Sequence, residues 1–169
     1  LNRLAGFVRS KATFTFLHER MKAKFVECGF HARRMVTVGN PVEPWTSDRI
    51  PAERNRDFLF VGRLGRDKGA DLAAEAATRA GVALTLVGDG ELAESLRGWE
   101  ADLRMAGWTD RAGLAGHACR ARALIVPSRV VEPFGLVILE AAMSGLPVIV
   151  SDRAYLATDA ERIGFGIAF

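Results

Sequence analysis

Two glutamates, Glu132 and Glu140, are the side chains in this sequence best suited to bind a polar ligand. Glu132 lies in a predicted loop, and Glu140 lies inside a predicted apolar helix over residues 135–144. A carboxylate buried in so apolar a helix costs free energy unless it has hydrogen-bonding partners, and a ligand rich in hydroxyl groups would supply them. The alternative is that Glu140 lies on an exposed stripe of the helix. Its apolar neighbours leave that stripe narrow, which favours a binding role.

The start of the same helix is suited to bind an anion. Pro133 and Gly135 lead into it, and the amides of residues 135–137 have no partner within the helix. Such amides, together with the helix dipole, favour negative charge. The sequence therefore predicts an anion site beside the loop that contains Glu132.

A basic loop after the predicted strand at residues 58–61 is a second candidate for binding phosphate. It contains two glycines and three cations: Gly62, Gly65, Arg63, Arg66 and Lys68. The glycines allow a tight turn and a close approach to a ligand, and the cations lie at the start of a predicted helix. The loop lacks the Gly-Lys-Ser/Thr of a Walker A motif. Its residues alone leave two interpretations open, a phosphate cradle or a solvated turn capped by Asp67.

A third loop supports a different function. Gly88, Gly90 and Ala93 match the pattern Gly-x-Gly-x-x-Gly/Ala between a strand and a helix, and Asp110 lies near the spacing expected for a ribose-binding acid. This pattern favours a dinucleotide-binding domain of an NAD-dependent oxidoreductase. It does not lie in the first strand–helix unit of the sheet, however, and it leaves the two glutamates unexplained.

Alternating strands and helices position these loops. Apolar strands are predicted at residues 58–61, 82–87, 103–106, 123–126 and 148–150, and helices at residues 68–80, 91–99, 111–120 and 135–144. Short apolar strands without alternation are typical of a sheet covered on both faces. The sequence therefore predicts an α/β fold with a doubly wound parallel sheet of the Rossmann type. Ligands bind such sheets beyond the carboxyl ends of the strands, at the loops of residues 62–67, 88–90, 107–110 and 127–134.

The first part of the chain has a separate pattern. A strand is predicted at residues 13–17, a helix at residues 18–28 and a second strand at residues 35–38, and the loop of residues 49–57 is polar. The turn-rich stretch of residues 39–45 between these parts is the best predicted domain boundary. We expect the phenylalanines of the first part to form core: Phe14, Phe16, Phe25 and Phe30.

Length and composition limit the protein class. The chain has 169 residues, of which 49% are hydrophobic, which suits one domain or one domain with a piece of another. It contains no predicted transmembrane span or signal peptide and starts with Leu1, so we interpret it as part of a longer protein. Two cysteines without metal spacing, Cys28 and Cys119, favour a reducing, cytoplasmic compartment.

Charge is unevenly distributed along the chain. Residues 1–34 contain eight basic residues against Glu19 and Glu27, a surplus of six, so the rest of the chain has a net charge of −3. A basic segment of this kind can contact an anionic membrane surface, an anionic substrate or nucleic acid, but a solvated helix face is the preferred interpretation. Nucleic-acid binding requires a basic and aromatic surface, which the net acidic remainder does not provide.

In these residues the sequence resembles retaining glycosyltransferase family four, whose members have the two-domain GT-B fold. The resemblance is most specific at Glu-Pro-Phe-Gly-x4-Glu-Ala, which contains Glu132 and Glu140, followed by Gly145-Leu-Pro-Val-Ile-Val. The loops at residues 61–69, 87–90 and 107–108 resemble the phosphate and nucleotide loops of that family. Residues 39–42, Gly-Asn-Pro-Val, resemble its hinge.

The resemblance implies a role for each matching residue. Arg63 and Lys68 would hold the diphosphate of a nucleotide sugar, Glu140 would accept hydrogen bonds from the ribose, and Glu132 would orient the donor sugar. The catalytic residues would thus be Glu132, Arg63 and Lys68, and the donor-binding residues Gly62, Gly88, Gly90, Ser128, Phe134, Gly135, Leu136, Val137 and Glu140. Cations and helix amides would stabilise the charge on the leaving nucleoside diphosphate. The resemblance implies transfer with retention and without a cofactor. The sequence contains no Asp-x-Asp, so nothing in it suggests a metal that bridges the diphosphate.

The resemblance also implies the organisation of the whole protein. Residues 1–44 would be the end of the acceptor domain with the hinge, and residues 45–169 a C-terminally truncated donor domain. The acceptor would be a sugar or a lipid-linked sugar. Family members are about twice as long as this chain, so we expect the chain alone to bind donor without transferring it. A non-catalytic nucleotide-sugar-binding module is a further alternative.

Overall fold

The computed structural model describes residues 12–30, 33–99 and 102–169. Three basic residues of the predicted membrane-contact segment, Arg3, Arg9 and Lys11, lie outside the described residues. The chain divides into two compact units, Leu1–Pro41 and Val42–Phe169. Among the described residues, no helix is both long and apolar enough to span a bilayer.

The first unit contains a small parallel β-α-β arrangement. Strand β1 (Phe14–Phe16) pairs in parallel with β2 (Met35–Thr37), and helix α2 (Glu19–Glu27) connects them. The imidazole of His18 accepts a hydrogen bond from the Arg20 amide at 3.1 Å and so caps the helix. Gly29, in the left-handed region at φ +82°, follows the helix and ends it, in agreement with the predicted helix at residues 18–28.

The phenylalanines of this unit contact one another edge to face. The rings of Phe14 and Phe30 lie 4.9 Å apart, and Phe25 contacts both Phe16 and Phe30. Phe16 is buried, but Phe25 remains 44% exposed. The expected core at these positions is therefore a small aromatic cluster that only partly excludes water.

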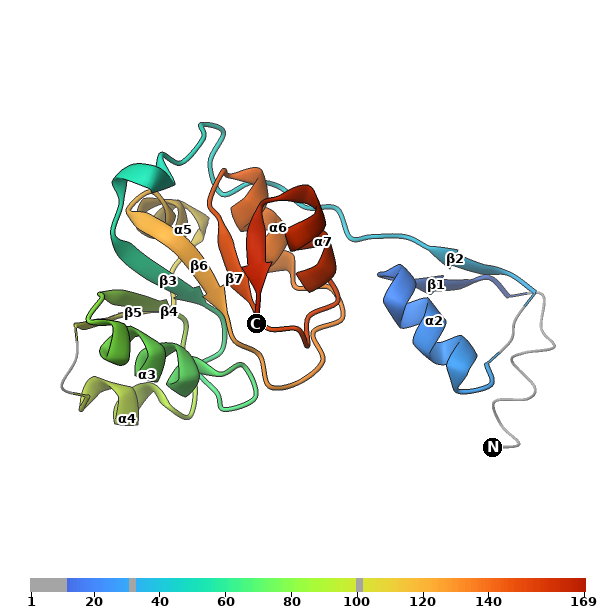
Figure 1. Ribbon diagram of the computed structural model, residues 1–169, viewed down its shortest axis with the longest axis horizontal. Helices are drawn as coiled ribbons and strands as arrows, with labels where there is room; N and C mark the ends of the chain where they lie inside the picture. Colours follow the sequence, from blue (N-terminus) through green and yellow to red (C-terminus); the bar gives the residue numbers. More distant parts are fainter. Residues whose placement is uncertain (1–11, 31–32, 100–101) are drawn as a thin grey trace. The chain divides into compact units, whose positions relative to one another are not determined.

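The second unit is built on a six-stranded parallel sheet with the order β5-β4-β3-β6-β7-β8 (Figure 1). The strands are β3 (Asp57–Val61), β4 (Leu84–Val87), β5 (Leu103–Gly107), β6 (Ala121–Val126), β7 (Val148–Val150) and β8 (Gly166–Ala168). The connecting helices are α3 (Ala70–Ala80), α4 (Ala93–Arg97), α5 (Arg111–Ala118), α6 (Leu136–Met143) and α7 (Ala157–Ile163), preceded by the 3-10 turn η1 (Ala52–Arg54). The predicted doubly wound α/β fold is confirmed.

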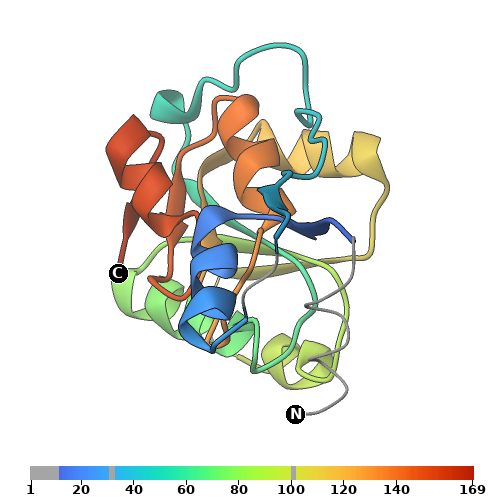
Figure 2. The same cartoon turned by 90° about the vertical axis from the view of Figure 1, so that its right-hand side faces the viewer.

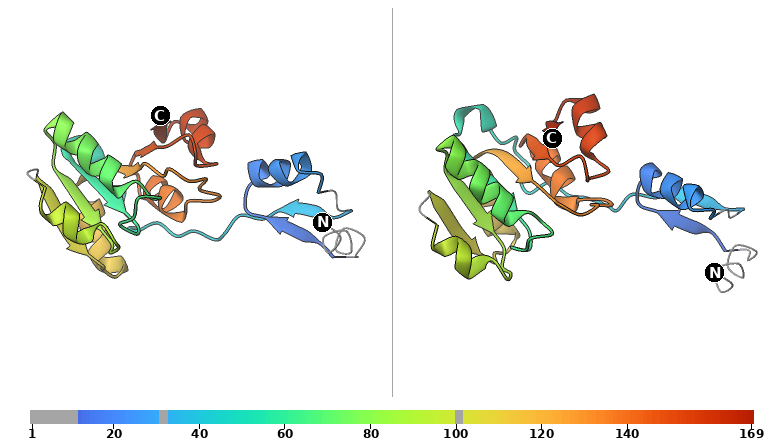
Figure 3. Two further views of the ribbon diagram at one scale, coloured as in Figure 1. Left: turned by 90° about the horizontal axis from the view of Figure 1, so that it is seen from below. Right: turned by 60° about the horizontal axis from the view of Figure 1, so that its bottom comes forward.

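Helices cover both faces of this sheet, which explains why the strands are apolar throughout. Phe60 and Leu86 pack against the small alanines of α3, whereas Leu59 and Leu124 belong to the cluster on the opposite face. Figures 2 and 3 show α3 and α6 on opposite sides of the strands. The alanines on the buried side of α3 allow the helix to approach the sheet closely: Ala70, Ala73, Ala74 and Ala77.

The structure corrects the sequence prediction at two places. The predicted loop of residues 49–57 contains η1, and its last residue, Asp57, begins β3, where its carboxylate pairs with Arg104 of the same sheet. After residue 150 the pattern predicts no element, yet α7 and β8 form there. The strand was missed because three residues that include Gly166 are too short to show a pattern.

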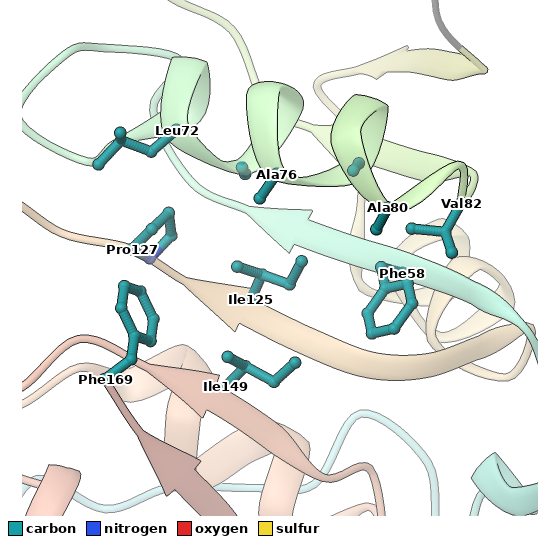
Figure 4. Close-up of a pocket in the computed structure, with 11 residues that line it drawn as sticks. Phe58, Leu72, Ala76, Ala80, Val82, Ile125, Pro127, Ile149 and Phe169 are labelled. Carbon is teal, nitrogen blue, oxygen red and sulfur yellow. The ribbon is translucent and has the colours of Figure 1, made fainter.

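An apolar groove of about 430 Å³ runs along α3 on one face of the sheet (Figure 4). Ile125 of β6 and Ile149 of β7 form part of its floor, and Leu72, Pro127 and Phe169 lie at one end. Its lining side chains are apolar, so this groove does not suit a charged nucleotide sugar. The candidate site lies instead at the carboxyl ends of the strands.

Candidate functional site

The order of the strands reverses between β3 and β6, at the centre of the sheet. Ligands of open α/β sheets bind in the crevice at such a switch point. The loops that follow these two strands contact each other there, because the Arg129 amide donates to the Asp67 carbonyl at 2.9 Å. Lys68 of the first loop forms an ion pair with Glu132 of the second. Two predicted catalytic residues, 64 positions apart in sequence, therefore lie together.

The loops after β3, β4 and β5 also lie against one another. The Leu64 amide donates to the Asp89 carbonyl at 2.8 Å, and the Gly88 amide donates to the Gly107 carbonyl at 2.8 Å. A Cβ added at Gly88 would lie 2.0 Å from the Gly62 carbonyl oxygen, and Gly88 has φ +135°. Gly88 is therefore required for the close approach of two backbone segments, and Gly62, at φ +150°, has a backbone conformation that favours glycine.

Two of the three predicted cations of the basic loop, Arg63 and Lys68, form ion pairs with carboxylates. The Arg63 guanidinium lies 2.5 Å from the Asp67 carboxylate and remains 56% exposed. The N-cap of α3 is Gly69, with no side-chain cap, so Asp67 does not cap this helix as the solvated-turn interpretation expected. Lys68 is less exposed than Arg63, and its partner Glu132 is only 18% exposed. The loop thus holds an accessible guanidinium beside a half-buried ammonium.

A further arginine holds the basic loop in place. The Arg129 guanidinium donates to the Arg66 carbonyl at 2.6 Å and pairs with both carboxylate oxygens of Asp71 at 2.6 and 3.0 Å. The hydrogen bond from Arg129 lowers the pKa of Asp71 below its usual value, and the same bond raises the pKa of Arg129. The sequence interpretation missed this pair, because its members are far apart in the chain.

The backbone on both sides of Glu132 is fixed by the segment that follows β7. The Glu132 amide donates to the Arg153 carbonyl at 3.2 Å, and the Tyr155 amide donates to the Glu132 carbonyl at 3.1 Å. Glu132 also forms an isolated parallel bridge with Ala154. These bonds orient the loop so that the carboxylate reaches Lys68.

Helix α6 begins beside this loop, as predicted. Gly135 is its N-cap in the left-handed region, and Leu136 is its first residue. Ser128 and Phe134 are buried, Val137 is partly buried against the core, and Leu136 is 44% exposed. The first amides of the helix have no intrahelical partner, and such amides can bind an anion. The loop that leads into them contains Glu132, the partner of Lys68 from the loop after β3.

Glu140 lies one helical turn further along α6, and its side chain is 21% exposed. The carboxylate is therefore partly buried, although Leu136 and Met143 on the same face of the helix are exposed. The carboxylate lies 3.9 Å from the Arg111 guanidinium. Arg111 is the first residue of α5 and also donates to the backbone carbonyls of Glu43 and Pro44. Nothing in the sequence pattern linked Arg111 to Glu140.

The acid proposed for dinucleotide binding has a structural role. Asp110 is the N-cap of α5, and its carboxylate accepts a hydrogen bond from the Gly113 amide at 2.8 Å. The Gly88–Gly90 loop follows β4 and does not follow β3, the strand at the switch point. The geometry therefore does not favour the oxidoreductase alternative.

Comparison with known proteins agrees with this geometry. Residues 55–165 match the family described as glycosyl transferases group 1. This match covers most of the chain, so the protein belongs to the glycosyl transferases group 1 family.

Particular relatives share the domain over part of their length. A glycogen synthase of Mycobacterium tuberculosis is 34% identical over 119 residues, which cover 62% of this chain and 28% of that protein. The solved structure of Anabaena HepE in complex with UDP has a TM-score of 0.79 at 20% identity, over 99% of this chain and 53% of that one. WaaG, a glycosyltransferase involved in lipopolysaccharide biosynthesis, has a TM-score of 0.77 at 19% identity, over 95% and 50%. The chain thus spans about half of these solved structures and has the fold of their GT-B domains.

Proposed function

We propose that this chain is the donor-binding half of a retaining glycosyltransferase of family four. In this proposal residues 45–169 bind a nucleoside diphosphate sugar, and residues 1–44 are the end of the acceptor domain with the hinge. The observation that supports it most strongly is the meeting of Lys68, Glu132 and the start of α6 at the switch point of the sheet. The family match to glycosyl transferases group 1 supports the same class of reaction.

The diphosphate would bind between Arg63, Lys68 and the first amides of α6. Cations and amide dipoles at this position stabilise the negative charge that develops on the leaving nucleoside diphosphate. Lys68 is paired with Glu132, so an incoming phosphate shares the ammonium with that carboxylate. Glu132 would then face the donor sugar and orient it for transfer with retention, while Glu140 would accept hydrogen bonds from the ribose hydroxyls.

No metal or cofactor is part of this proposal. The cations and amides supply the positive charge that a bridging metal would otherwise supply, and the sequence contains no Asp-x-Asp. UDP is the first nucleotide to test, because HepE was solved with UDP. The acceptor would be a sugar or a lipid-linked sugar, as the role of WaaG in lipopolysaccharide biosynthesis suggests for that relative. The basic residues among 1–34 would favour contact with the surface of the membrane from the cytoplasmic side.

Calorimetric titration of the chain with UDP, GDP, ADP and NAD tests the proposal. We expect one nucleoside diphosphate to bind and NAD to give no heat of binding. Binding of NAD without any nucleoside diphosphate would favour the dinucleotide-binding oxidoreductase instead. Transfer assays on a protein that also contains the acceptor domain separate an enzyme from a non-catalytic nucleotide-sugar-binding module.

A further inference from the structure

We infer that Arg111 is a positioning residue that orients the Glu140 carboxylate toward a bound ribose and couples nucleotide binding to the order of residues 43–45. These residues, called the lead-in segment here, open the second unit just after its boundary at Val42. The inference rests on the proposed function, in which Glu140 binds the ribose.

Arg111 holds the lead-in segment by its backbone. One terminal nitrogen, Nη2, donates to the Glu43 carbonyl at 2.9 Å and to the Pro44 carbonyl at 2.6 Å. The other terminal nitrogen, Nη1, lies 3.9 Å from Glu140 Oε1. The planar guanidinium thus contacts the lead-in segment through Nη2, and its Nη1 faces Glu140, the residue proposed to bind the ribose. Lysine has a single point charge in place of this fork and cannot hold both partners in the same geometry.

A second attachment joins the lead-in segment to the same helix. The amide of buried Trp45 donates to Ser144 Oγ at 2.8 Å, and the Ser144 hydroxyl donates to the Glu140 carbonyl at 2.7 Å. Ser144 is itself buried at the end of α6. The lead-in segment is therefore linked to Glu140 both at its carboxylate, through Arg111, and at its backbone, through Ser144.

The geometry of the ion pair leaves the carboxylate available to a ligand. At 3.9 Å the guanidinium attracts the carboxylate but makes no short hydrogen bond to it, so the carboxylate oxygens can accept ribose hydroxyls. Hydroxyls bound to Glu140 fix the carboxylate, and this restrains Arg111 and the carbonyls that it binds. Coupling between two sites is reciprocal, so loosening the lead-in segment must weaken nucleotide binding by the same factor.

The test compares the binding of UDP with that of 2′,3′-dideoxy-UDP, which lacks both ribose hydroxyls. If ADP or GDP binds more tightly than UDP, that nucleotide and its 2′,3′-dideoxy form are compared instead. Calorimetry gives the affinity of wild type, Arg111→Ala, Arg111→Lys and the control Arg79→Ala, whose exposed side chain pairs with Glu75 on the same helix, α3. We expect Arg111→Ala to weaken UDP binding about fivefold, near the lower end of couplings between sites. Its affinity for the dideoxy nucleotide should stay unchanged. Arg111→Lys should recover part of the loss, and Arg79→Ala should match wild type.

Hydrogen exchange of the Trp45 amide supplies the second readout. In wild type we expect UDP to slow this exchange, whereas in Arg111→Ala and Arg111→Lys the slowing should be reduced. The Lys variant decides the result if the Ala variant does not fold. If Arg111→Ala lost equal affinity for UDP and for the dideoxy nucleotide, or if UDP did not slow exchange of the Trp45 amide in wild type, the inference would be overturned. The proposed function would stand in either case. A wild-type chain that binds no nucleoside diphosphate would overturn the proposed function, and the inference with it.

Discussion

Substitution of Gly88 by alanine tests whether the close approach of the loops at the switch point builds the site. The added methyl group would lie 2.0 Å from the Gly62 carbonyl oxygen, closer than any unstrained contact, and the residue has φ +135°. A non-glycine residue held in such a region costs about 1–3 kcal/mol. Displacing packed neighbours costs about 1–3 kcal/mol more. We therefore expect the free energy of unfolding of the second unit to fall by about 3 kcal/mol in Gly88→Ala.

Urea denaturation followed by circular dichroism measures this loss, and Gly116→Ala is the matched control. An added Cβ at Gly116, inside α5, meets nothing within 4 Å, so this variant should gain about 0.5–1 kcal/mol from helix propensity. Nucleoside diphosphate affinity should also fall in Gly88→Ala, since the Gly62 loop leads into Arg63 and Lys68. A Gly88→Ala protein as stable as wild type would refute the argument that these two backbones must touch.

Three further predictions concern binding and pH. Lys68→Gln should weaken nucleoside diphosphate binding about 10- to 100-fold, because a charge-assisted hydrogen bond is lost, whereas a nucleoside should bind as before. If calorimetry showed the same loss of affinity for the nucleoside as for the nucleoside diphosphate, a contact between Lys68 and the phosphates would be excluded. Nucleoside diphosphate affinity should be the same in excess chelator, and a loss that magnesium restores would contradict the metal-free site. Arg129 lowers the pKa of Asp71 below 3.8, so the stability from this pair is present above about pH 4 and is lost as pH falls through the lowered pKa. Urea unfolding over this pH range should show a smaller decline in Asp71→Asn than in wild type.

Much of the fold follows from local patterns in the sequence. Apolar strands separated by helical periodicity predicted the parallel sheet, and the glycines after β3 and β4 marked the loops at its carboxyl end. The short β8 was not predictable, because Gly166 and the two residues after it form a strand only through pairing with β7. Local pattern also failed at Asp57, whose place in β3 depends on pairing with Ala121 of the distant strand β6.

The candidate site was predictable as a set of residues but not as a set of contacts. The residue types of Arg63, Lys68, Glu132 and Glu140 indicated anion and hydroxyl binding from the sequence alone. Their partners were not evident, because contacts between distant residues depend on which strands are neighbours. The Lys68–Glu132 pair exists because β3 and β6 are adjacent, and Arg111 reaches Glu140 from a different helix.

The most direct test of the central claim is a crystal structure of this chain with the nucleoside diphosphate that binds most tightly. The account predicts the diphosphate between Arg63, Lys68 and the first amides of α6, and the ribose hydroxyls on the Glu140 carboxylate. A nucleotide bound with its phosphates at the Gly88–Gly90 loop and its ribose on Asp110 would contradict the account.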